Sequence, residues 1–169
     1  MKKLAMLTVC FALIIACLSG CANTPGENSA GGSKNIEGSL EDLMQKIYDN
    51  LDDDVRLPMM LTSIVLSEDM DFFSIPWFIG SEDVKFSEGL GSEALVGAIP
   101  YSLVLLRMED GVDIESQKQL IKDSVDPRKW ICVGVDPSEV IVDNIGNLVV
   151  VIMSTDCEQI HDSFLKLAD

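Results

Sequence analysis

The hydrophobic positions divide the chain into three zones. Lys2 and Lys3 precede an apolar run over residues 4–18, and residues 22–38 are almost entirely polar. From Ser39 onward, hydrophobic positions recur with the spacings of helices and strands. The apolar run has about 15 residues, fewer than the roughly 20 that a membrane-spanning helix needs. A basic start, a short apolar core and small residues after it predict a cleaved secretory signal over residues 1–20.

The end of the apolar run carries a specific motif, Leu18-Ser19-Gly20-Cys21. These residues resemble the lipobox of bacterial lipoproteins, in which the cysteine is acylated and the chain is cut before it. The resemblance implies a mature chain that begins at Cys21 and is anchored by lipid on the extracytoplasmic side of the cell membrane. A retained helix and an ordinary secretory signal are the alternatives. Two or more acyl chains make a lasting anchor, because each buried methylene contributes ~0.8 kcal/mol.

Residues 21–38 are predicted to be a flexible tether that follows the lipidated cysteine. Gly, Ser, Asn and Pro dominate this segment, and it contains almost nothing that a core could bury. A coil of this length spans roughly 20–25 Å root-mean-square. We expect it to join the anchor to a single domain over residues 39–169.

Three helices of this domain are predicted from their caps and their periodicity. Ser39 is the N-cap candidate of the first helix, with Asp42 at its third position. Asp113 is expected to cap a helix that ends at Val125, and Asp156 a final helix to Leu167.

The strands are predicted from short apolar runs between turn residues. They lie at residues 83–92, 101–108, 130–135, 139–143 and 148–153. Residues 59–66 fit either a strand or a short buried helix. The run at 148–153 is apolar on both faces, which indicates a central strand covered on both sides or a strand under a helix. Short hairpins mixed with helices predict an α+β fold, a two-layer sandwich with a mainly antiparallel sheet and helices packed on one face.

The charge of the chain excludes one class of partner. The 169 residues include 12 basic and 28 acidic ones, giving a formal net charge of -16. Lys2 and Lys3 are the only charged residues before Cys21, so removal of the signal takes the net charge to -18. Such a surface repels phosphate backbones, so nucleic acid binding is not expected. Solubility explains the acidity most simply, and capture of cations or basic peptides is the alternative.

The cysteines leave one question open. Cys10 and Cys17 fall in the predicted signal, and Cys21 is the predicted acylation site. Cys132 and Cys157 remain for the domain. Outside the cytoplasm they could form a disulfide, and each could equally be a small buried hydrophobic residue.

A second resemblance covers most of residues 40–168. The matching segments are Asp126-Pro127-Arg128-Lys129-Trp130-Ile131-Cys132-Val133, Val142-Asp143-Asn144 with Gly146, and Val151-Ile152-Met153-Ser154. Together they resemble a family of small bacterial lipoproteins that is catalogued as domain of unknown function four-three-five-eight. The resemblance implies a lipid-type signal and an acidic domain, and it brings no activity, cofactor or catalytic residue.

Candidate chemistry is sparse in this sequence. Arg128, Lys129 and Trp130 form the densest polar and aromatic cluster, which could bind an anionic ligand or simply join a helix end to a strand start. Cys157 and the only histidine, His161, are four residues apart and could share a helix face. No nucleotide-binding or hydrolase motif is present, and we expect neither a metal nor a cofactor. The sequence therefore favours a non-catalytic binding module of the cell envelope with a protein, peptide or glycan ligand. An envelope hydrolase that uses acidic residues or the Cys157/His161 pair is the alternative.

Overall fold

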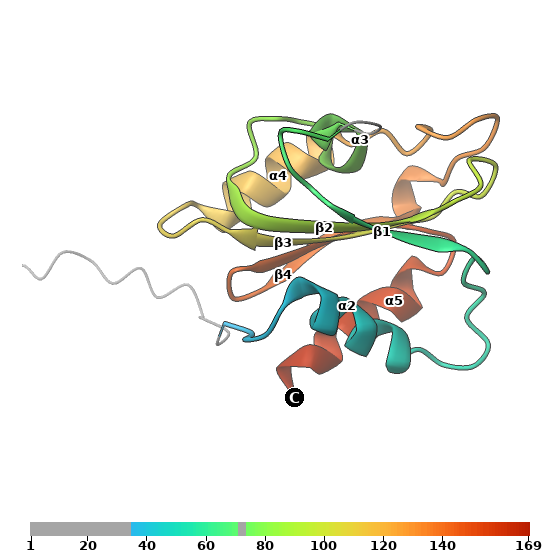
Figure 1. Cartoon of the computed structure of the whole chain (residues 1–169), viewed down its shortest axis with the longest axis horizontal. Coiled ribbons are helices and arrows are strands. Elements are labelled where there is room, and N and C mark those ends of the chain that lie inside the picture. The colour runs from blue at the N-terminus through green and yellow to red at the C-terminus, as the bar shows by residue number, and fades with distance from the viewer. Residues whose placement is uncertain (1–34, 71–73) are drawn as a thin grey trace, which may run out of the picture. The chain divides into compact units, whose positions relative to one another are not determined.

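The fold is built on one antiparallel sheet. A computed structural model describes residues 35–70 and 74–169 of the chain. Its five strands lie in the order β1-β2-β3-β5-β4 (Figure 1). They are β1 (Leu61–Val65), β2 (Phe86–Ala94), β3 (Ser102–Met108), β4 (Val140–Ile145) and β5 (Leu148–Met153). Each strand pairs with its neighbours in antiparallel fashion, so the predicted α+β class with an antiparallel sheet is confirmed.

Helices pack against both faces of this sheet. The α2 helix (Leu40–Asp49) and the α5 helix (Cys157–Leu165) lie on one face, and α3 (Ile75–Ile79) and α4 (Ile114–Ser124) lie on the other (Figure 1). A short 3₁₀ helix over Lys166–Ala168 follows α5, and another over Pro137–Glu139 precedes β4. The prediction had placed the helices on one face only. The difference matters because it gives the domain two hydrophobic layers instead of one.

The central strands explain why both faces need helices. Alternate side chains of a strand point to opposite faces, so a strand that is apolar at every position must be covered twice. In β5 every residue is buried. Leu148, Val150 and Ile152 pack with α2 and α5, whereas Val149 and Val151 pack with α3 and α4. The all-apolar run at 148–153 was therefore correctly interpreted as a covered central strand.

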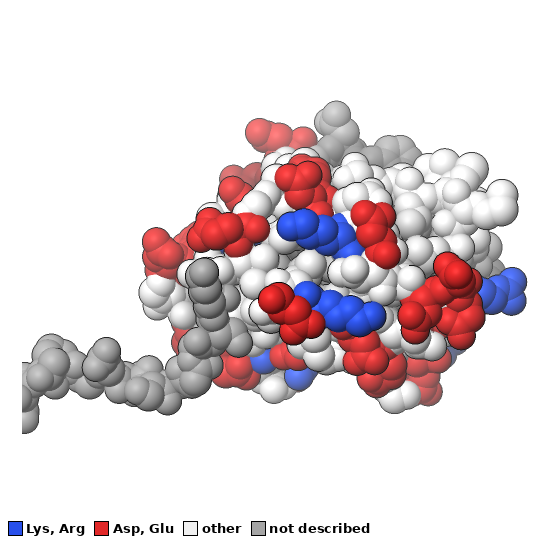
Figure 2. Space-filling model, turned by 90° about the horizontal axis from the view of Figure 1, so that it is seen from below, with Lys and Arg blue, Asp and Glu red and all other residues white. Residues whose placement is uncertain are grey.

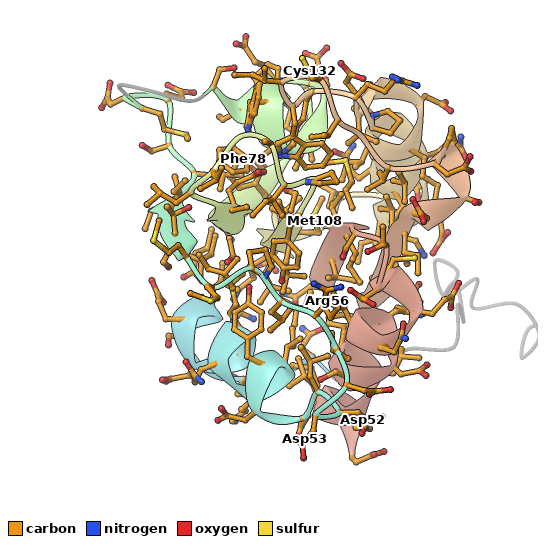
Figure 3. The ribbon with its side chains drawn as sticks, turned by 90° about the vertical axis from the view of Figure 1, so that its right-hand side faces the viewer. Asp52, Asp53, Arg56, Phe78, Met108 and Cys132 are labelled. Carbon is orange, nitrogen blue, oxygen red and sulfur yellow. The ribbon has the colours of Figure 1, made fainter. Side chains whose placement is uncertain are left out.

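Two of the three predicted helix caps are confirmed. The Ser39 hydroxyl accepts a hydrogen bond from the Asp42 amide at 3.1 Å, and the Asp113 carboxylate accepts one from the Ser116 amide at 3.3 Å. Asp156 does precede α5, but its side chain makes no capping hydrogen bond. In Figure 3 the loop that carries Asp52, Asp53 and Arg56 runs from α2 to β1 across one end of the molecule.

The predicted strand over residues 130–135 is wrong. This segment is a loop, closed by a hydrogen bond of 2.9 Å from the Val135 amide to the Pro127 carbonyl. Cys132 has a φ of 61°, a left-handed conformation that no strand residue adopts. Trp130 and Val135 are buried, whereas Ile131 is 75% exposed. The apolar residues of the run therefore close a loop over the core and do not pair with the sheet.

The two edges of the sheet differ. At the β4 edge, the Asp143 carboxylate accepts hydrogen bonds from Lys118 of α4 and interacts with His161 of α5, at 3.3 and 2.8 Å. These helices lie on opposite faces, so side chains from both layers meet at that edge. At the other edge, β1 pairs with β2 alone among the described strands.

Candidate functional site

A groove runs between α2 and the β1 edge of the sheet. A pocket of about 700 Å³ lies at one end, and a pocket of about 250 Å³ lies beside it. The two pockets adjoin at Glu41 of α2 and Leu90 of β2, which line both of them, and they are treated together as one groove. We call it the α2–β1 groove.

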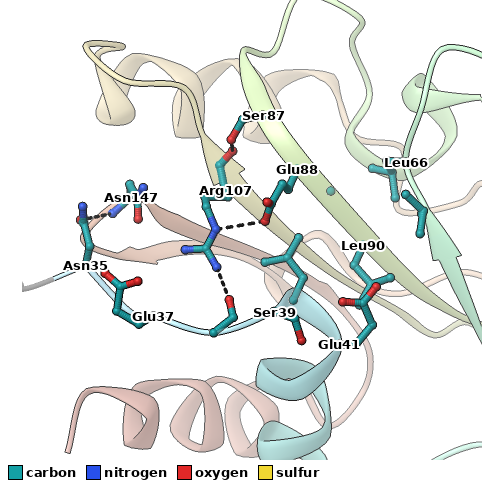
Figure 4. Close-up of a pocket in the computed structure, with 14 residues that line it drawn as sticks. Asn35, Glu37, Ser39, Glu41, Leu66, Ser87, Glu88, Leu90, Arg107 and Asn147 are labelled. Atoms are coloured by element: carbon teal, nitrogen blue, oxygen red, sulfur yellow. Dashed lines mark hydrogen bonds and ion pairs between the residues drawn. The ribbon is translucent and has the colours of Figure 1, made fainter.

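The larger pocket is organised by Arg107 (Figure 4). The Arg107 Nε lies 3.1 Å from a carboxylate oxygen of Glu88, on the neighbouring strand. The two terminal nitrogens donate to the carbonyls of Ile36 and Gly38, at 2.9 and 2.7 Å. The guanidinium thus holds the segment that precedes α2 against the middle of the sheet. Asn35 in the same segment accepts a hydrogen bond of 3.1 Å from the Asn147 amide.

The smaller pocket has a polar cluster at its base. The Tyr48 hydroxyl donates to Ser92 Oγ at 2.7 Å and lies 3.0 Å from the hydroxyl of Tyr101. Burial raises the pKa of the Tyr48 phenol, and its hydrogen bonds with Ser92 and Tyr101 partly offset the rise. Burial raises the pKa of Tyr101 well above its ordinary value. Both phenols therefore stay neutral and serve as hydrogen-bonding groups that fix α2 on the sheet.

The groove is acidic. Glu37, Glu41 and Glu88 line the larger pocket, and the one basic residue in its lining is Arg107. Figure 2 shows the face that carries α2 and α5, where acidic side chains outnumber basic ones. Arg107 is already engaged by the Glu88 carboxylate and two carbonyls. The negative charges of Glu37 and Glu41 therefore have no basic partner in the lining of the pocket.

The predicted Arg128, Lys129 and Trp130 cluster lies elsewhere, in the loop over the core. The Lys129 side chain is 4% exposed and is engaged in three hydrogen bonds. Its ammonium donates to Glu93, to the Trp77 carbonyl at 3.0 Å and to Ser102 Oγ at 3.2 Å. Since an ammonium has three protons, Lys129 has none left for a ligand.

Aromatic rings complete the surroundings of Lys129. Its ammonium lies 5.2 Å from the ring centres of Trp77 and Phe78 and 5.1 Å from that of Trp130. Trp130 also donates to the second Glu93 oxygen at 3.2 Å. Burial lowers the pKa of Lys129, and the Glu93 carboxylate opposes that change. The cluster pins the 126–135 loop to the core. Trp130 is buried, as the structural interpretation expected, but no strand starts there.

Arg128 differs from its two neighbours because it is exposed. Its guanidinium makes no hydrogen bond or ion pair with the described residues. It borders a small pocket of about 300 Å³ together with Gly134 and Asp136. The structure thus leaves Arg128 alone available to a ligand and separates it from Lys129 and Trp130 in function.

The Cys157/His161 pair does not form a dyad. The His161 Nε2 lies 2.8 Å from the Asp143 carboxylate, and no hydrogen bond joins it to the Cys157 thiol. Cys157 is buried, and this burial raises the pKa of its thiol, as does the neighbouring Glu158 carboxylate. A buried thiol with a raised pKa is a poor nucleophile. Cys132 is exposed, and both cysteines are free.

Metal-binding clusters and membrane-spanning helices are absent from the described residues. No group of three or more His, Cys, Asp or Glu in this part of the chain is arranged to hold a metal ion. None of its helices has the length and apolar character needed to span a membrane. The predicted lipidation site, Cys21, lies outside the described residues, as does most of the predicted tether.

Sequence reasoning missed the α2–β1 groove. Its residues belong to segments that are far apart along the chain, from Asn35 to Asn147. The one local signal was the composition of Leu61–Val65, a strand without charge or proline. The edge position of that strand follows from the sheet order, which no short motif reveals.

Comparisons with known proteins identify no relative. No protein-family model matches the chain, and the searches of curated proteins and of solved structures also return no match. The resemblance to the uncharacterised lipoprotein family therefore stays a prediction from the sequence.

Proposed function

We propose that this protein is a lipid-anchored binding module of the bacterial cell envelope, without catalytic activity of its own. The proposal joins the lipobox-like segment at Cys21 to a domain that binds a partner in the α2–β1 groove. The observation that carries it is the groove, whose two pockets adjoin at Glu41 and Leu90. A hydrolase that uses Cys157 and His161 gains no support from the contacts of these residues.

The position of the groove supports this function. Asn35, Glu37 and Gly38 in its lining are among the last residues of the predicted tether, so an anchor at Cys21 would hold the groove near the membrane. Glu41 and Gln45 on the groove wall are exposed. The tether length of roughly 20–25 Å allows the domain to turn toward a partner in the envelope.

Lipid anchoring is tested by metabolic labelling with a radioactive fatty acid. We expect the full chain to incorporate label and to fractionate with membranes, and the Cys21→Ala variant to lose both properties. Label that persists in Cys21→Ala, or a native chain without label, would contradict the anchor.

Groove binding is tested by site-specific photo-cross-linking in intact cells. A photo-reactive phenylalanine analogue replaces Gln45 on the groove wall in one variant and Gln119 on α4 in the control. The two sites are matched, because each glutamine is exposed and donates to an aspartate four residues later at 2.8 Å. We expect a discrete cross-linked partner from position 45 and none from position 119. Equal products at both positions, or none at 45, would contradict a binding groove.

A further inference from the structure

Among the described strands, none pairs with the outer side of β1 or of β4, but β4 carries a charged side chain and β1 does not. At the β4 edge, Lys118 and His161 reach Asp143 from opposite faces. In β1, Leu61–Val65 contains no charged residue and no proline, and its pairing with β2 has no bulge. Natural proteins normally protect an exposed edge strand with charged residues, prolines or bulges, because its unpaired backbone groups can pair with another chain. Their absence makes the β1 edge a candidate docking surface.

The register identifies the backbone groups that face outward. The Leu95 amide donates to the Met60 carbonyl at 3.0 Å, and the Leu66 amide donates to the Gly89 carbonyl at 2.9 Å. Even-numbered residues of this segment therefore make the hydrogen bonds with β2. In an antiparallel pair the intervening residues direct their amide and carbonyl groups away from the partner. Leu61, Ser63 and Val65 thus offer three donors and three acceptors along the free edge.

The groove leaves room for the side chains of an added strand. Leu61 and Ser63 line its smaller pocket and Val65 its larger one. On the opposite wall stand Glu41, Met44, Gln45 and Tyr48 of α2. A polypeptide that continued the sheet beyond β1 would direct every second side chain into this space. A strand edge beside a helix is a geometry that suits peptide binding by strand addition.

Charge selects the chemistry of the added segment. Glu37 and Glu41 lie at the end of the groove beside Val65, where Arg107 is already engaged by Glu88 and two carbonyls. The opposite end of β1 is apolar. There Met59 is fully exposed. The side chains of Met60 and Leu95 are also exposed, and the backbones of these two residues are hydrogen-bonded to each other. A basic, extended peptide with apolar residues at its other end complements both features.

We propose that β1 binds an extended basic segment of an envelope protein as an additional antiparallel strand of the sheet. This inference rests on the proposed function, because it names the occupant of the α2–β1 groove and the way in which it binds. Main-chain hydrogen bonds to Leu61, Ser63 and Val65 supply the docking, and the groove glutamates select basic side chains.

The first experiment measures hydrogen exchange of the full chain, purified in detergent, with and without a probe peptide. The probe is an alternating Lys-Val peptide of about ten residues, long enough to cover a five-residue edge. We expect slower exchange at the amides of Leu61, Ser63 and Val65, with little change at Thr62 and Ile64, which already pair with β2. The same peptide with every backbone amide methylated keeps its charge and its side chains, and it should not slow these amides.

The second experiment separates groove charge from overall charge. Glu41→Lys changes a glutamate in the first turn of α2, and Glu158→Lys makes the same change in the first turn of α5 on the same face of the sheet. We expect the Kd of the probe to rise roughly tenfold in Glu41→Lys and to stay within about twofold in Glu158→Lys. Circular dichroism melting of both variants checks that each is folded.

Three results would overturn strand addition. They are equal binding of the methylated probe, equal weakening in the two lysine variants, and absence of the alternating exchange pattern. A partner that cross-links at position 45 despite such results would leave the groove function intact and exclude only this mode of binding. A chain that sediments as a dimer, is converted to a monomer by Ser63→Pro and ignores the probe would identify a second copy as the occupant and also overturn the proposal.

Discussion

Single residues in this protein owe their roles to their surroundings more than to their type. Lys129 looked like an anion-binding residue because it follows Arg128 in an acidic chain. In the structure its ammonium is buried against Glu93 and three aromatic rings. Glu93 is more than 30 residues away along the chain, so no local pattern could pair them. A buried charge keeps its position only with such a partner, since an unpaired one is costly.

The His161 environment illustrates the same point and can be tested by pH. Partial burial opposes ionisation of Asp143, but hydrogen bonds from His161, the Asn144 backbone and Lys118 prevail and lower the pKa of its carboxyl. A lowered folded-state pKa means that the carboxylate adds stability above the unfolded pKa of about 3.9, and that this contribution is lost as pH falls through the folded value.

We therefore expect Asp143→Asn to reduce the free energy of unfolding by about 1 kcal/mol at pH 7 and by much less near pH 3. Urea denaturation of both proteins at the two pH values measures the difference. Asp162→Asn is the control, because Asp162 follows His161 in α5 and is exposed. A constant difference between Asp143→Asn and the parent at both pH values would contradict the role of the ionised carboxylate.

At the scale of elements, local signals predicted the helices better than the strands. Ser39 and Asp113 cap their helices as expected, because a cap is a contact between residues three positions apart. The run at 130–135 failed, because an apolar run indicates burial without saying what it pairs with. The left-handed Cys132 and the bond from Val135 to Pro127 close that run into a loop.

The contact between α3 and α4 gives a prediction for one glycine. Gly80 ends α3 with a φ of 80°, and a Cβ added there would lie 2.2 Å from the backbone carbon of Ser124, the last residue of α4. Gly111 has the same φ of 80°, but a Cβ there would meet nothing within 4 Å. The two positions share the backbone cost of alanine and differ only in the steric contact.

We expect Gly111→Ala to cost about 1 kcal/mol of unfolding free energy, which is the penalty for a left-handed alanine. Gly80→Ala should cost about 3 kcal/mol, because the ends of α3 and α4 must also move apart. Chemical denaturation of both variants measures these values. Equal losses in the two variants would show that the helix ends adjust without strain.

At the scale of the whole molecule, the sequence predicted the class of the fold and not its layering. The antiparallel pairing follows from short turns, such as the one between β4 and β5. The sequence does not show which face of the sheet each helix packs against, so it could not place α3 and α4 on the second face. The α2–β1 groove could not be predicted for the same reason. It exists only because β1 lies at an edge of the sheet and α2 lies beside it.

The net charge of -16 has a consequence for stability. Like charges repel one another more strongly in the compact state than in the expanded chain, and salt screens that repulsion. The Debye length falls from roughly 30 Å at 0.01 M salt to roughly 3 Å at 1 M. We expect the Tm of the full chain at neutral pH to rise by several degrees over this range of NaCl, measured by circular dichroism.

Potassium chloride serves as the control for this experiment and should give the same shift, because screening depends on ionic strength and not on the cation. A Tm that falls with added salt would mean that favourable ion pairs outweigh the repulsion.

The bonds of Arg107 also determine how the domain would respond to tension. A pull on the chain ahead of Asn35 reaches the carbonyls of Ile36 and Gly38 before it reaches the first turn of α2. The load then passes through the guanidinium into β3, which is braced by β2 on one side and β5 on the other. Force applied to the chain ahead of the domain would thus be borne by the central strands of the sheet. The α2 helix, which forms one wall of the groove, would not be pulled from the sheet first.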